Sequence, residues 1–282
     1  MNPGSCGRVP WMAVLVHQSP GLTGPLSLPG EWSERKARDR ASAPWPGATV
    51  RPRWGTMTDL LAATARRAEP ARQVAARTVD LRKVYGTGDA ALAALDGVSL
   101  EFVTGEFTAV MGPSGSGKST LLHCMAALDT ASSGRVYVGD TELSGLNDRK
   151  LTRLRRDKLG FVFQSYNLIP TLSARENIVL PLAIAGRRPD PAWFDEVVDA
   201  VGMRDRLEHR PHELSGGQQQ RAAAARALVS KPAIVFADEP TGNLDSRAGA
   251  ELLSFLRRSV DEHGQTIVMV THDPVAPPTP TG

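Results

Sequence analysis

The segment GPSGSGKST, residues 112–120, constrains the fold of this chain more than any other stretch. It follows the apolar run FTAVM and precedes STLLHCMAALD, in which apolar residues recur at helical spacing. A strand that enters a glycine-rich loop and continues into a helix is the setting of a phosphate-binding loop. The glycines let successive backbone N–H groups point at phosphate oxygens, and the helix start adds its positive dipole end. The sequence therefore predicts an α/β fold with a phosphate site at this junction.

Two side chains of this loop have specific predicted tasks. Lys118 would place its ammonium between the β- and γ-phosphates of a nucleotide, and the Ser119 hydroxyl would hold Mg²⁺. A glycine- and serine-rich turn can match the pattern by chance, but the flanking strand and helix favour phosphate binding. The predicted phosphate-binding residues are Gly112, Pro113, Ser114, Gly115, Ser116, Gly117, Lys118, Ser119 and Thr120.

A pair of carboxylates follows the run AIVFA, which is typical of a buried strand in the middle of a parallel sheet. Ligands of such sheets bind at the carboxyl ends of the strands. Asp238 ends the strand, and we expect it to reach Mg²⁺ directly or through water. Glu239 would face the γ-phosphate and accept a proton from the attacking water. Alone, the pair would be a solvated strand end; together with the phosphate loop, it predicts a catalytic site.

A third glycine-rich segment, LSGGQQQR, covers residues 214–221. Ser215 would cap the helix that follows, while Gly216 and Gly217 would leave its first N–H groups open to a phosphate. One ATP does not need two such cradles from one chain. The segment, with Gln218, is therefore predicted to serve a nucleotide held by another copy.

From about residue 76, short apolar runs bounded by glycine alternate with helical patterns, as in α/β proteins. RTVDLRKVYG and VSLEFVTGEFTAVMG predict strands, the second divided at Thr104 and Gly105, and TIVMVTHD predicts another. Residues from about 146 to 228 show mainly helical patterns, with one strand at LGFVFQ. No run approaches the roughly 18 apolar residues of a membrane span.

The formal net charge of +3 is concentrated in the N-terminal segment. Residues 1–56 carry seven basic and three acidic side chains, so the rest of the chain is close to neutral. This segment is also rich in proline and glycine, which is typical of chains that do not fold. We predict a disordered tail over residues 1–75 and no nucleic-acid partner. We also hypothesise that Met57 is the true start; a native basic tail is the alternative.

Taken together, these residues resemble the nucleotide-binding subunit of ATP-binding-cassette (ABC) transporters, whose signature is LSGGQ and whose other parts occur in the family's order over roughly residues 77–274. The resemblance implies a P-loop NTPase fold over residues 76–274. This fold has a RecA-like core sheet, an antiparallel β subdomain and a helical subdomain at about 165–228.

The resemblance also assigns roles to four further residues. Tyr85 in KVYGTG resembles the aromatic residue that stacks on adenine, and Gln164 in FVFQSYNLIP resembles the glutamine that touches Mg²⁺ and senses the membrane subunit. Asp245 in GNLDS resembles the acidic residue that links the two sites of a dimer. His272 in VTHDP resembles the switch histidine that contacts the γ-phosphate.

By resemblance, the protein is an ATPase with ATP and Mg²⁺ as its cofactors. Two copies would close head to tail over two ATP molecules and drive a separate permease from the cytoplasmic face of the cell membrane. The subgroup it most resembles exports macrolides or peptides, releases lipoproteins or serves cell division. The alternatives are a soluble ABC ATPase of DNA repair or translation, and a truncated protein that binds nucleotide without turnover.

The chain ends in PPTPTG, whose three prolines disfavour helix and sheet. Members of the family continue past the switch histidine with a short helix and further strands, so we expect these C-terminal strands to be missing here. Codons for Ala-Ser-Tyr-Ala-Asp-Arg, read one base late, give Pro-Pro-Thr-Pro-Thr-Gly. This leads to the hypothesis that residues 275–282 are a disordered end created by a frameshift.

Overall fold

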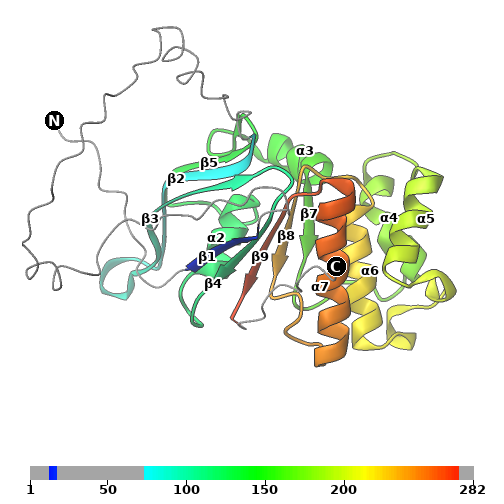
Figure 1. Cartoon of the computed structure of the whole chain (residues 1–282). Coiled ribbons are helices and arrows are strands. Elements are labelled where there is room, and N and C mark those ends of the chain that lie inside the picture. Colours follow the sequence, from blue (N-terminus) through cyan, green and yellow to red (C-terminus); the bar gives the residue numbers. More distant parts are fainter. Residues whose placement is uncertain (1–12, 18–72, 273–282) are drawn as a thin grey trace, which may run out of the picture. The chain divides into compact units, whose positions relative to one another are not determined.

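The computed structural model describes residues 13–17 and 73–272 of the chain (Figure 1). The hypotheses on Met57 and on the end at residues 275–282 lie outside these ranges, as does most of the predicted tail. Within the described ranges, no helix is both long enough and apolar enough to cross a membrane.

One sheet of the protein is antiparallel and confirms the predicted β subdomain. Its strand order is β3-β2-β5-β6. The predicted break between two strands is present at Gly105, whose φ of 75° favours glycine. The sequence analysis did not identify the last two strands. The four strands are β2 (Val74–Tyr85), β3 (Leu92–Val103), β5 (Ser133–Val138) and β6 (Thr141–Glu142).

The second sheet is the predicted core sheet, with the strand order β1-β4-β9-β8-β7. Its last four strands are parallel, and β8 lies between β9 and β7 as expected of a buried central strand. This arrangement brings the carboxyl ends of β4, β9 and β8 to one edge. The five strands are β1 (Ala13–His17), β4 (Phe107–Met111), β7 (Leu159–Val162), β8 (Ile234–Asp238) and β9 (Ile267–Thr271).

Strand β1 corrects the prediction of a disordered tail over residues 1–75. It pairs antiparallel with β4, from Ala13 opposite Met111 to His17 opposite Phe107. The pairing occupies the outer hydrogen-bonding edge of β4, which would otherwise expose unpaired backbone groups. The run AVLVH is far too short for a membrane span, but its five residues suffice for a strand.

Alternate residues of β8 enter two separate hydrophobic cores because successive side chains of a strand point to opposite faces. Ile234 and Phe236 pack in the core that contains α2 and the antiparallel sheet. Val235 and Ala237 pack in the core that contains α6 and α7. The helices are α2 (Lys118–Met125), α3 (Asp148–Lys158), α4 (Ala174–Ile184), α5 (Pro191–Ala200), α6 (Gly216–Leu228) and α7 (Ser246–His263).

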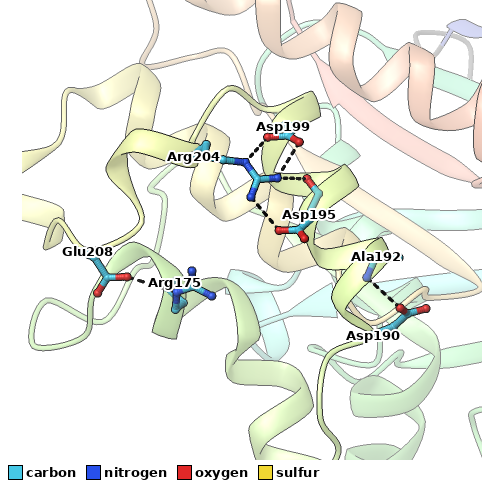
Figure 2. A network of polar contacts seen from close by, with 7 residues as sticks. All are labelled: Arg175, Asp190, Ala192, Asp195, Asp199, Arg204 and Glu208. Carbon is cyan, nitrogen blue, oxygen red and sulfur yellow. Dashed lines mark hydrogen bonds and ion pairs between the residues drawn. The ribbon is translucent and has the colours of Figure 1, made fainter.

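Helices α4, α5 and α6 form the predicted helical subdomain, beyond the β7 edge of the core sheet (Figure 1). Its surface carries charged clusters. The Arg204 guanidinium donates hydrogen bonds to the carboxylates of Asp199 and Asp195, and so joins the turn after α5 to the helix itself (Figure 2). These groups are solvated, so they fix local geometry more than they stabilise the fold.

Candidate functional site

The predicted phosphate loop begins where β4 ends and leads into α2. Gly117 is the N-cap of α2, has a left-handed φ of 85° and makes no side-chain cap hydrogen bond. A Cβ at this position would lie 2.3 Å from the backbone oxygen of Ala94 in β3. Only glycine fits here, because both the conformation and the space exclude a side chain. The first N–H groups of α2 therefore remain available to an anion.

Two polar side chains of the loop are enclosed within it. Lys118 is 5% exposed, and its Nζ donates hydrogen bonds of 2.9 Å to the carbonyl oxygens of Gly112 and Pro113. The Oγ atom of Ser116 is buried and, among the described residues, has no hydrogen-bond partner. A buried cation and an unsatisfied hydroxyl within a curved run of N–H groups form a cradle suited to phosphate oxygens.

Ser119 and Asp238 meet beside this loop. The Ser119 hydroxyl donates a 2.8 Å hydrogen bond to Oδ1 of Asp238, although the two residues are 119 positions apart. His123, one turn further along α2, places its Nε2 3.3 Å from the other oxygen of Asp238. The hydrogen bond with Asp238, opposed by burial, raises the pKa of His123. A hydroxyl and a carboxylate are the hard oxygen ligands that suit Mg²⁺, so the residues fit the predicted ion.

Glu239 lies immediately past β8 with an unusual backbone conformation for a non-glycine residue, φ 44°. Its N–H donates to the Val270 oxygen in the neighbouring strand β9, at 3.0 Å. Its Oε1 lies 3.1 Å from Nδ1 of His272. The strained conformation directs the carboxylate toward the histidine, and such strain is typical of functional sites. The structure thus brings these two predicted residues together.

Gln164 follows β7 and reaches the segment after Glu239. A Cβ added to Gly242 would lie 2.7 Å from Nε2 of Gln164. The side-chain amide of Asn243 donates to the backbone carbonyl oxygen of Gln164 at 3.0 Å. Gly242 is itself held by a hydrogen bond from its N–H to the Glu239 oxygen. The loop containing Gln164 and the catalytic strand end are therefore in direct contact.

Tyr85, at the end of β2, is 43% exposed. Its hydroxyl donates a 2.6 Å hydrogen bond to Asp129, which lies just beyond α2, and it is also within hydrogen-bonding reach of the Thr120 side chain. The predicted base-stacking residue therefore stands next to the helix that follows the phosphate loop.

The second glycine-rich segment begins helix α6. Ser215 accepts a hydrogen bond from the N–H of Gln218, and the Gln218 side chain accepts one from the Ser215 N–H, so the predicted cap is a complete capping box. Gly217 lies close to α7: a Cβ added to Gly217 would lie 3.1 Å from the Cβ of Ala248. Asp245 caps α7 by accepting from the Ala248 N–H at 2.8 Å.

The two glycine-rich helix starts do not meet within the chain. Helix α2 follows β4, whereas α6 packs against β7. Two strands lie between β4 and β7 in the sheet, so the strands are about 14 Å apart at the usual strand spacing. The phosphate loop therefore lies at the end of β4, while the second glycine-rich segment begins a helix on the β7 side of the core sheet.

Two residues of α6 have roles that the sequence analysis missed. Gln220 is fully buried, and its Nε2 donates to the carbonyl oxygens of Phe163 and Pro240, at 3.0 and 2.8 Å. These carbonyls adjoin Gln164 and Glu239. Arg226 donates to the carbonyls of Tyr166 and Asn167 in the same loop, and burial lowers its pKa. Helix α6 is thus tied to the loop after β7 and to the segment after β8, and three of these four hydrogen bonds span 57 or more residues of sequence.

Comparison with known proteins supports one family. The sequence pattern described as ABC transporter matches residues 95–242, a range that contains every predicted site residue except Tyr85, Asp245 and His272. An uncharacterized ABC transporter ATP-binding protein of Thermotoga maritima is 49% identical over 69% of this chain and 84% of that protein. The macrolide export ATP-binding/permease protein MacB of Marinobacter nauticus is 46% identical over 69% of this chain but only 30% of that protein.

A similar solved structure is the dimeric ATP-binding cassette MJ0796 of Methanocaldococcus jannaschii, in a post-hydrolysis state bound to ADP and Pi. Its TM-score to this chain is 0.64, at 41% sequence identity, and the similarity covers 70% of this chain and 88% of that one. The arrangement of core sheet, antiparallel sheet and helices is therefore that of an ATP-binding cassette.

Proposed function

We propose, from the premise that this chain belongs to the ABC transporter family, a division of labour among its residues in ATP hydrolysis. The chain is an ATP-binding, ATP-hydrolysing subunit of this family. One observation carries the proposal: the phosphate loop, the Asp238–Glu239 pair and His272 converge at the carboxyl ends of the adjacent strands β4, β8 and β9. Ligands of open α/β sheets bind at this edge.

Binding of ATP relies on the start of α2. The N–H groups of the loop and the ammonium of Lys118 hold the β- and γ-phosphates, and the buried hydroxyl of Ser116 donates to a phosphate oxygen. Ser119 and Asp238, with Gln164, would hold Mg²⁺, which when bound neutralises phosphate charge. Lys118 would exchange its present hydrogen bonds to loop carbonyls for bonds to phosphate.

Hydrolysis relies on Glu239. Its carboxylate orients a water molecule toward the γ-phosphate and accepts the proton that the water loses on attack. His272, whose ring contacts the Glu239 carboxylate, holds that carboxylate in place and reaches the γ-phosphate from β9. The result is ADP and inorganic phosphate.

We further propose that a complete site needs two copies of the chain, arranged head to tail. Within one copy, α2 follows β4 whereas α6 packs against β7, with two strands of the sheet between β4 and β7. In the dimer, Ser215 and Gly217 of one copy would face the γ-phosphate held by the other, and Asp245 would link the two sites. The dimeric state of the MJ0796 cassette supports this arrangement.

We propose that ATP hydrolysis drives a membrane permease, and that the subunit binds this permease at the cytoplasmic face of the membrane. Closure and reopening of the dimer would shift the loop that contains Gln164 and so move the attached permease. Similarity to macrolide export MacB and to the bacitracin export protein BceA of Halalkalibacterium halodurans supports an export or release function.

Phosphate release by the purified full-length chain, with ATP and Mg²⁺, tests the proposal. The wild type should turn over, and Glu239→Gln should lose turnover by about 10²- to 10⁴-fold while binding ATP as tightly. Asp199→Asn, on the surface of the helical subdomain, is a control that should retain turnover. ATP binding by the wild type without any phosphate release would favour a nucleotide-binding protein without turnover. A wild type that does not bind ATP would overturn the proposal.

A further inference from the structure

The ring of Tyr85 is held in position from both ends of its side chain. Its backbone leads into Gly86, whose φ of 77° and close approach to the Ala90 oxygen (2.6 Å from an added Cβ) exclude other residues. Its hydroxyl donates to Oδ2 of Asp129 at 2.6 Å. Tyr85, which is 43% exposed, is thereby held beside the turn that follows α2.

Lys83 and Asp129 complete this arrangement. The Lys83 Nζ donates to Oδ1 of Asp129 at 2.6 Å and to the Thr130 carbonyl at 2.7 Å. The same Nζ lies 4.7 Å from the centroid of the Tyr85 ring, at cation–π distance. One carboxylate therefore binds both the ammonium and the phenol, and the ammonium also contacts the ring.

Asp129 is anchored to the helix that follows the phosphate loop. Its backbone N–H donates to the His123 oxygen at 3.2 Å, and its Oδ1 accepts from the Thr130 N–H at 2.7 Å. Burial raises the pKa of Asp129, but hydrogen bonds from Lys83 and Tyr85 outweigh it, and the pKa is lowered. The hydrogen bond to Asp129 raises the pKa of Tyr85. The carboxylate stays ionised and the phenol stays a donor at neutral pH.

We propose that Asp129 and Lys83 are positioning residues that hold the Tyr85 ring parallel to the base of the bound nucleotide, while the phosphates bind the loop before α2. The proposal rests on the proposed function, because it assumes that ATP occupies that loop. Lys83 covers part of the ring, and the exposed part offers a flat surface on which a purine stacks. The three side chains would then set affinity for the base and leave affinity for the phosphates unchanged.

Binding of ATP compared with binding of inorganic tripolyphosphate separates the two contributions, because tripolyphosphate has no base. In the full-length protein, Tyr85→Ala should weaken ATP binding about 5- to 150-fold, the range of one lost base stack. Asp129→Ala should weaken it about 3- to 10-fold, and Tyr85→Phe, which keeps the ring, about 2- to 3-fold. All three should bind tripolyphosphate within about twofold of the wild type. The KM for ATP should rise and kcat should stay constant.

A double-mutant cycle shows whether Asp129 acts through the ring. In the Tyr85→Ala background, Asp129→Ala should cause no further loss of ATP affinity. An undiminished loss in that background, or equal losses for ATP and tripolyphosphate, would overturn the proposal. Tyr85→Phe removes only the hydroxyl oxygen, so it remains a decisive test if Asp129→Ala folds poorly. Wild-type ATP affinity in Tyr85→Phe would also overturn the proposal. Failure of the proposed function is distinct, because the wild type itself would then bind neither ligand.

Discussion

Helices α2 and α6 both begin on glycine-rich segments, but their first turns are finished in different ways. The N-cap of α2 is Gly117, which has no side chain to offer, and a buried hydroxyl beside it lacks a partner among the described residues. The N-cap of α6 is Ser215, which exchanges two hydrogen bonds with Gln218. In the proposed function, a phosphate would complete the α2 start. The α6 start already has a complete capping box, and its remaining N–H groups would be available to the nucleotide of a second copy.

The difference between the starts of α2 and α6 indicates how one site can be assembled from two chains. The α2 start can bind its ligand alone, because Lys118, Ser119 and Asp238 already surround it. The α6 start holds a fixed shape without ligand, as a surface must if it is to recognise a nucleotide already bound by another copy.

Alanine substitutions at the two helix starts should have very different costs. Gly117→Ala places a Cβ against the Ala94 backbone in a left-handed conformation, and should lower the free energy of unfolding by about 2–5 kcal/mol. In Gly216→Ala the closest atom to the added Cβ is the Tyr166 hydroxyl, the end of a side chain that can move aside, and the Asn243 backbone oxygen lies 4.0 Å away, so the cost should be about 1 kcal/mol or less. Urea denaturation measures both. Equal losses would contradict the contrast.

Ser215→Asp should separate the stability of α6 from its function. Aspartate caps a helix as well as serine does, so the free energy of unfolding should stay within about 0.5 kcal/mol of the wild type. Its carboxylate would repel the nucleotide of the second copy, and turnover should fall about 100-fold or more. Ser215→Thr is the matched control that keeps both the cap and turnover. Full turnover by Ser215→Asp would show that no phosphate approaches this helix start.

Gln220 joins α6 to the loops after β7 and β8, so its substitution should lower the stability of the whole fold. Gln220→Met conserves volume but leaves the buried carbonyls of Phe163 and Pro240 without their donor, which should cost about 2 kcal/mol of folding free energy. The neighbouring Gln219, whose side chain donates to the Leu214 carbonyl, is the control, and Gln219→Met should cost less than about 1 kcal/mol. Similar costs in thermal or urea denaturation would refute the role given to Gln220.

The far ends of the two helices should differ in pH dependence. The pKa of Asp129, beyond α2, is lowered from 3.8, so its ionised form is favoured in the folded state. Its contribution, below about 1 kcal/mol for this partly exposed group, should be present above pH 3.8 and vanish as the pH falls through the lowered pKa. The loss in free energy of unfolding caused by Asp129→Ala should therefore shrink in acid. The loss caused by Val229→Ala, at the buried apolar end of α6, should not depend on pH.

Local patterns predicted much of this site. The phosphate loop, the buried strand before Asp238 and the cap at Ser215 each depend on a few consecutive residues, and the structure places each as the sequence indicates. The meeting of Ser119 with Asp238 followed from the rule that parallel strands present their carboxyl ends at one edge.

The missed features depend on contacts between distant segments. Gln220 lies in a run of three glutamines, and nothing local distinguishes the buried one from its neighbours. The partnership of Lys83 with Asp129 spans 46 residues. Strand β1 was missed because its five residues form a strand only when β4 supplies the pairing edge. Such pairings are set by tertiary structure, which a single sequence does not show.

The central claim is that α2 of one copy and α6 of another share each nucleotide, and mixing two inactive variants tests it most directly. Lys118→Ala disables the start of α2, and Ser215→Asp disables the start of α6. Each alone should release almost no phosphate from ATP. A mixed dimer contains one site with both intact halves, so an equimolar mixture should recover roughly one quarter of wild-type activity. A mixture no more active than its two components would contradict the account.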